Sequence, residues 1–181
     1  RFNRDLLVAD ENTEIILEVI KNRIAGPCNK KFRRDIIREN NVMFNENLVI
    51  GEDFVFGLEY MLLCETSKVL PACLYYVDET GADSVTRRAA YDFSQFLLIY
   101  KEAFRIAESC QWENQKKQKL IRTLDYLYCR TAFACMERCI SAKLEITPKV
   151  LISLFYTQLR PDIVPINLTH GIMRLLVKFK V

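Results

Sequence analysis

Glycine and proline are scarce in this chain of 181 residues, which contains five of each. Sandwiches and barrels with many tight turns need more of both residues, so their scarcity favours long helices. No apolar run reaches the roughly 20 residues that a helix needs to cross a bilayer. The start of the chain also lacks a charged segment followed by an apolar one, so no signal peptide is predicted.

Histidine and closely spaced cysteine are also lacking. The single histidine is His170, and none of the seven cysteines forms a C-x-x-C pair. Structural zinc sites need several such ligands at close spacing, so we expect no metal site in this chain. The cysteines lie mostly among apolar residues, which is typical of small buried side chains in a reducing compartment. Because the chain begins with Arg1 rather than methionine, we interpret it as a piece of a longer cytoplasmic protein.

A strong excess of charge is absent too. The formal net charge is +3, which does not indicate a nucleic-acid partner. Half of the residues are apolar, which excludes an intrinsically disordered chain. The length suffices for a domain of ordinary size with a hydrophobic core.

Apolar residues recur at helical spacing along much of the chain. This pattern predicts helices over residues 12–23, 32–39, 52–64, 89–108 and 115–143. The last two should pack as an antiparallel hairpin joined near Trp112. Thr147-Pro148 is typical of a helix start, and a further helix is expected there, followed by a final amphipathic helix over residues 168–179.

One segment predicts β structure instead. Residues 68–77 are interrupted by Pro71, which fits two short strands around a turn or one bent edge strand. The fold class expected from the sequence is therefore α+β and mainly α. We expect residues 1–88 to form one part and residues 89–181 to form a C-terminal helical bundle.

An ordered series of short motifs lies between residues 26 and 86. The first three are Cys28-Asn29-Lys30-Lys31-Phe32-Arg33, Phe44-Asn45-Glu46 and Gly51-Glu52-Asp53, and Tyr75-Tyr76 and Ser84-Val85-Thr86 follow. In this order they resemble the acceptor side of family 2 glycosyltransferases with the A-type fold. The chain departs from that family's pattern at Cys28, where tryptophan is usual, and at Asp78, where a basic residue is common.

The resemblance implies an inverting transfer of a sugar from a nucleotide sugar to a glycan or lipid-linked acceptor. It makes Asp53 the base that takes the proton of the acceptor hydroxyl. It places the remaining candidates at the substrates: Glu52, Asn29, Lys30, Arg33, Tyr76, Ser84 and Arg87. The family's nucleotide-binding half, with its Asp-x-Asp motif, has no counterpart here. Mg²⁺ or Mn²⁺ is expected only with that half, and the isolated chain is expected to be inactive.

Structural interpretations of the same residues stay open. Acidic residues in a first helical turn commonly just stabilise the helix. The basic residues 30–34 are also typical of a solvated surface, and Tyr75 and Tyr76 of an ordinary strand. The alternative hypothesis from another functional class is a non-catalytic helical module that self-associates.

The last predicted helix bears on that alternative. Residues 168–181 carry Arg174, Lys178 and Lys180 among apolar residues. This composition favours packing against the protein or a second copy in a homodimer. Peripheral contact with the inner face of a membrane is the other interpretation.

Overall fold

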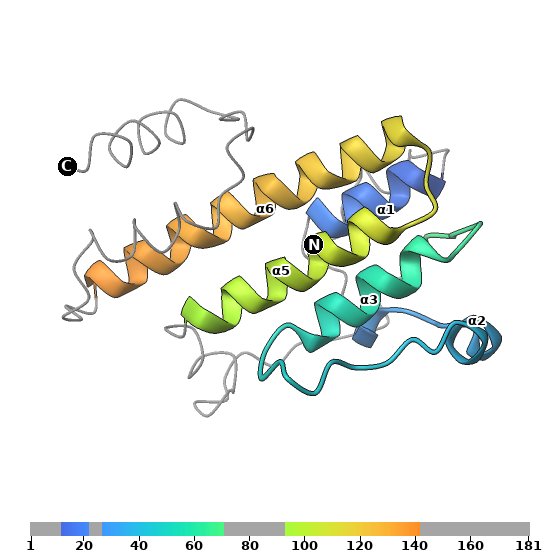
Figure 1. Ribbon diagram of the computed structural model, residues 1–181, viewed down its shortest axis with the longest axis horizontal. Coiled ribbons are helices and arrows are strands. Elements are labelled where there is room, and N and C mark those ends of the chain that lie inside the picture. Colours follow the sequence, from blue (N-terminus) through green and yellow to red (C-terminus); the bar gives the residue numbers. More distant parts are fainter. Residues whose placement is uncertain (1–11, 22–26, 71–92, 142–181) are drawn as a thin grey trace.

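A computed structural model describes residues 12–21, 27–70 and 93–141, and this part of the protein is helical (Figure 1). Its elements are α1 (Asn12–Lys21), the 3-10 turn η2 (Pro27–Asn29), α2 (Arg34–Glu39), α3 (Glu52–Leu62), α5 (Phe93–Ser109) and α6 (Asn114–Ser141). The mainly helical prediction is thus confirmed for the described residues. They contain no strand, and residues 66–70 lack regular secondary structure.

Several predicted elements lie outside the described residues. These are most of the expected β segment, at residues 71–77, and both helices predicted beyond residue 146. The boundary proposed at residues 88 and 89 also falls there. The fold described below therefore concerns the helices before residue 71 and the hairpin of α5 and α6.

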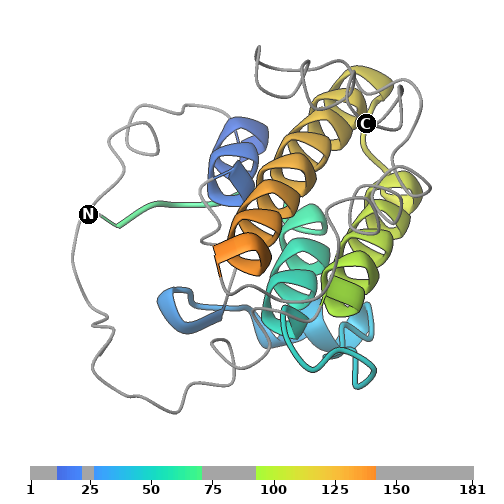
Figure 2. The same ribbon diagram turned by 90° about the vertical axis from the view of Figure 1, so that its left-hand side faces the viewer.

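The four longer helices form a bundle in which α1 and α6 run in one direction and α3 and α5 in the other (Figures 1 and 2). Helix α1 packs against α6 and α3, while α5 packs against α3 and α6. Two long-range contacts join the start of α1 to the chain just after α3 and to the first part of α6. The Asn12 side-chain amide donates to the Cys64 carbonyl oxygen at 2.7 Å, and Lys119 pairs with Glu14 at 3.0 Å.

The apolar faces of these helices meet in one core. Its largest completely buried side chains come from three helices and one loop: Ile16 and Ile20, Val42, Leu58, and Leu120, Leu124 and Leu127. All but Val42 lie on the apolar faces that the helical spacing predicts. Burial of such faces, rather than intrinsic helix propensity, stabilises most helices of this length.

The predicted hairpin of α5 and α6 is confirmed, with residues 110–113 between the helices. A buried polar contact joins them, because the Tyr100 hydroxyl and Thr131 Oγ1 are 2.8 Å apart. The Tyr100 ring also meets Tyr128 edge-on, with centroids 5.1 Å apart. These contacts specify the relative position of the two helices more tightly than apolar packing alone.

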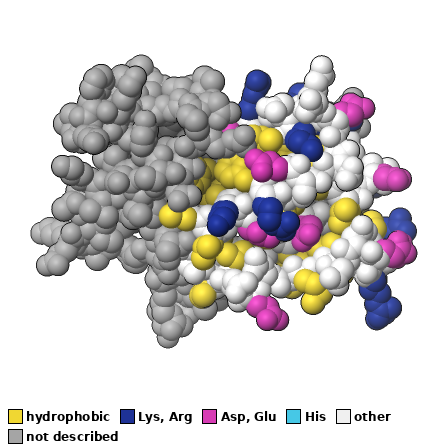
Figure 3. Space-filling model, in the orientation of Figure 1, with side chains coloured by type: hydrophobic (Ala, Val, Ile, Leu, Met, Phe, Trp, Pro, Cys, Tyr) yellow, Lys and Arg dark blue, Asp and Glu magenta, His cyan; other side chains and the backbone are white. Residues whose placement is uncertain are grey.

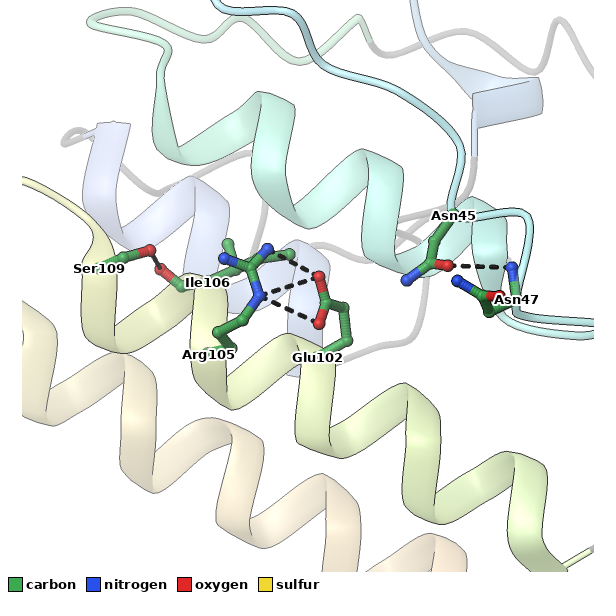
Figure 4. A network of polar contacts seen from close by, with 6 residues as sticks. All are labelled: Asn45, Asn47, Glu102, Arg105, Ile106 and Ser109. Atoms are coloured by element: carbon green, nitrogen blue, oxygen red, sulfur yellow. Dashed lines mark hydrogen bonds and ion pairs between the residues drawn. The ribbon is translucent and has the colours of Figure 1, made fainter.

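Charges of both signs are interspersed over the described part of the surface in Figure 3. On α5 the Arg105 guanidinium binds the Glu102 carboxylate at 2.7 Å, one turn away (Figure 4). Such exposed pairs contribute little to stability. Among the described helices, none has the length and apolar character required to span a membrane.

Candidate functional site

The first motif of the series lies against α3. Residues 27–29 form the turn η2, which the Lys30 N–H closes by donating to the Pro27 carbonyl at 3.1 Å. This turn packs against α3. Just after it, the Phe32 ring meets Phe56 and Tyr60 edge-on, with centroids 5.6 and 4.7 Å apart. Aromatic packing thus anchors the Asn29-Lys30 segment to the helix that carries Asp53.

Gly51 sets the start of α3. It adopts a left-handed conformation with φ of 73°, which glycine allows without steric cost. A side chain at this position would also collide with α5, since a Cβ would lie 2.5 Å from Ile99 Cδ1. The preceding loop is held on the same helix, because the Val49 N–H donates to Gln95 Oε1 at 3.0 Å. The Gly-Glu-Asp motif therefore has a defined position against α5.

Glu52 and Asp53 open α3, and both side chains are half-buried. Asp53 Oδ1 accepts a hydrogen bond of 2.7 Å from the Phe54 N–H. The carboxylate therefore binds a backbone donor of the first turn, where the helix dipole also favours negative charge.

Lys30 brings a positive charge to this carboxylate. Burial lowers the pKa of its amine to about 8, while electrostatic interactions with Asp53 and Cys28 act in the opposite direction. The amine donates to Asn29 Oδ1 at 2.6 Å. Lys30 and Asp53, predicted from separate motifs, are therefore close enough to interact electrostatically, and Asn29 is hydrogen-bonded to Lys30. A cation beside a carboxylate can hold and orient a polar ligand.

Comparison of the chain with protein-family models, curated proteins and solved structures finds no match. The likeness to family 2 glycosyltransferases therefore stays a prediction based on the motifs.

Arg33 has a different environment from Lys30. Its exposed guanidinium pairs with Asp35, and this pairing raises the pKa of Arg33 and lowers that of Asp35. The Arg33 backbone N–H donates to the Tyr60 hydroxyl at 2.8 Å. The structure thus places Arg33 at the outer edge of α2, where its side chain is engaged by a neighbouring acid rather than by Asp53.

The Phe44-Asn45-Glu46 motif forms a surface turn. Phe44 stacks on Phe56 with the ring centroids 4.3 Å apart. The Asn45 side chain accepts a hydrogen bond of 3.0 Å from the Asn47 N–H, as Figure 4 shows. Glu46 is exposed. These contacts are those of an Asx turn that shapes the loop before α3.

Three predicted site residues, Tyr76, Ser84 and Arg87, lie outside the described residues. Sequence reasoning missed Tyr60 and Ile99, which contact the first and third motifs from α3 and α5. Within the part of the chain that the structure describes, no three His, Cys, Asp or Glu side chains gather as a metal site requires.

Proposed function

We propose that this chain supplies the acceptor-binding side of an inverting glycosyltransferase. The observation that supports this function is the juxtaposition of two motifs that are more than 20 residues apart in the sequence. The turn that ends at Asn29 packs against the helix that bears Asp53, and Asp53 acts electrostatically on the Lys30 amine. In the resembling family both motifs belong to one substrate site, and an unrelated helical bundle has no need of this proximity.

In the proposed reaction, Asp53 takes the proton of an acceptor hydroxyl while that oxygen attacks the anomeric carbon of the donor sugar. The new bond forms on one face of the sugar as the bond to the nucleoside diphosphate breaks on the other. Asn29 and Lys30 bind the polar groups of the acceptor. A divalent cation is expected only with the nucleotide-binding half, and no step here is routed through one.

The nucleotide-binding half has to come from outside this chain. We expect the isolated chain to be inactive, because catalysis of transfer depends on holding donor and acceptor in one geometry. The test joins the chain to the nucleotide-binding half of a family 2 glycosyltransferase and assays release of nucleoside diphosphate from a panel of nucleotide sugars. Acceptor-dependent release by the joined protein, and not by either part alone, supports the proposal.

A helical module that only self-associates is the competing function. Its test compares the full chain with a version that ends before Leu168, by size-exclusion chromatography with light scattering. A dimer that becomes a monomer on truncation, together with no acceptor-dependent release in the joined protein, would favour the module. Acceptor-dependent release at either oligomeric state would favour the transferase.

A further inference from the structure

The aromatic ring of Phe44 has one face covered and the other open. It stacks on Phe56, with the ring centroids 4.3 Å apart and the two planes inclined by 6°. Phe56 is buried, whereas Phe44 is 48% exposed. Because a stacked partner covers one face of a flat ring, the exposed surface of Phe44 belongs mainly to its outer face and its rim. The loop before α3 therefore presents a flat aromatic surface whose orientation is fixed by the helix beneath it.

This surface lies close to the proposed base. Phe56 follows Asp53 by three positions in α3, and residues with this spacing lie on the same face of a helix, about 5 Å apart along its axis. The Phe56 ring also meets Phe32 of the first motif edge-on, with centroids 5.6 Å apart. Phe56 therefore contacts the first and second motifs and belongs to the helix that the third motif opens.

Polar side chains border the aromatic surface. Asn45 and Glu46 directly follow Phe44, and the Asn47 N–H donates to the Asn45 side-chain oxygen at 3.0 Å, which orients that amide. Glu46 is exposed. Amides and carboxylates bind hydroxyl groups, while the electron-rich face of an aromatic ring attracts weakly positive C–H groups. A pyranose offers both, because it has C–H bonds on its ring face and hydroxyl groups around its edge.

We propose that Phe44 is a stacking platform for a pyranose ring of the acceptor, so that the acceptor is recognised through a sugar rather than through an alkyl chain. The platform is the outer face of Phe44, supported by Phe56. That its occupant is the acceptor rests on the proposed function. A sugar stacked there has its hydroxyl groups on the side of α3 that bears Asp53, and the polar side chains after Phe44 bind the other hydroxyls.

The test is saturation-transfer difference NMR of the full chain with the hexyl β-glycosides of glucose, galactose and N-acetylglucosamine. Each probe offers a pyranose face and an alkyl chain in one molecule. We expect the strongest transfer to the axial C–H protons of one ring face, and titration gives the Kd.

Matched variants assign the binding to the flat ring. Phe44→Leu keeps an apolar side chain on Phe56 and removes the flat face, so the Kd should rise about two- to tenfold. Phe44→Tyr keeps the ring and should bind as the parent does. Leu63→Ala changes an exposed apolar residue at the other end of α3 and should leave the Kd unchanged. Circular dichroism verifies that each variant is folded.

Stronger transfer to the alkyl chain than to the ring, or no transfer to any probe, would overturn the platform. A Kd that Phe44→Leu leaves unchanged would overturn it as well. The proposed function fails separately: Phe44-dependent binding without acceptor-dependent release by the joined protein would refute the transferase and leave a sugar-binding surface. Acceptor-dependent release with an acceptor KM that Phe44→Leu does not raise would refute the platform alone.

Discussion

At the scale of single residues, Gly51 and Lys30 are the positions that the fold constrains most around Asp53. Gly51 combines a left-handed backbone with the close approach of Ile99. Lys30 combines a cationic group with partial burial. Most residues avoid a left-handed backbone, and most charged side chains avoid burial. Such unfavourable local features are found most often at functional sites.

Gly51→Ala should destabilise the protein by roughly 1–3 kcal/mol, because the methyl group adds backbone strain and collides with Ile99. Urea unfolding followed by circular dichroism measures the change in the free energy of unfolding. In an Ile99→Ala background the same substitution should cost less, since the nearest atoms are gone. An equal cost in both backgrounds would show that the contact with Ile99 is irrelevant.

Lys30 should make stability depend on pH in one direction. Its folded pKa is about 8 and its unfolded value is higher, so the folded state disfavours the charged amine. The resulting loss of stability is complete below pH 8 and is relieved as the pH rises toward the unfolded pKa of about 10.4. Relative to the parent, Lys30→Met should therefore be most favourable at pH 7 and lose this advantage by pH 10. Lys31→Met, at an exposed position, should show a constant difference. Urea titrations across this range decide between a converging and a constant difference for Lys30→Met.

At the scale of elements, the helical periodicity correctly predicted α1, α3, α5 and α6, and the hairpin joined near Trp112. A helix that buries one face has apolar residues spaced three or four positions apart, and this spacing is visible in the sequence. The contacts that place the motifs were not predictable in this way. The stacking of Phe44 on Phe56 and the bond from Asn12 to Cys64 join residues distant in sequence. No local pattern encodes such pairings, so the site could be predicted only as candidate residues and not as a geometry.

The apolar face of α6 provides a test of the bundle. Leu124 is completely buried, whereas Leu98 on α5 is 43% exposed. Leu124→Ala should cost about 2–5 kcal/mol because it leaves a cavity in the core. The chemically identical change Leu98→Ala should cost well under half as much. Chemical denaturation compares the two variants, and similar costs would contradict this packing of α6.

The polar contact between α5 and α6 should appear as a coupling energy. Tyr100→Phe and Thr131→Val each remove one hydroxyl of the buried pair. Because they affect the same hydrogen bond, the double variant should lose less stability than the two single variants added together, by about 1 kcal/mol. Thermal and urea unfolding of all four proteins complete the cycle. If the losses in the free energy of unfolding were additive, the two hydroxyls would not interact, which would contradict the hydrogen bond.

At the scale of the whole molecule, the bundle holds the turn η2 against α3, and the carboxylates of Glu52 and Asp53 in the first turn of α3 are half-buried. The proposed roles of Asn29, Lys30 and Asp53 therefore depend on one local arrangement. That arrangement is stabilised by aromatic contacts to Phe56 and Tyr60.

The role of Asp53 as a base is tested most directly by the turnover of the joined transferase after Asp53→Asn. The amide keeps the shape of the side chain and cannot take the acceptor proton, so kcat should fall by about 10²–10⁴-fold. Glu113→Gln, an exposed acid between α5 and α6, is the matched control and should leave kcat unchanged. Parent-like turnover in Asp53→Asn would contradict the assignment of Asp53 as the base.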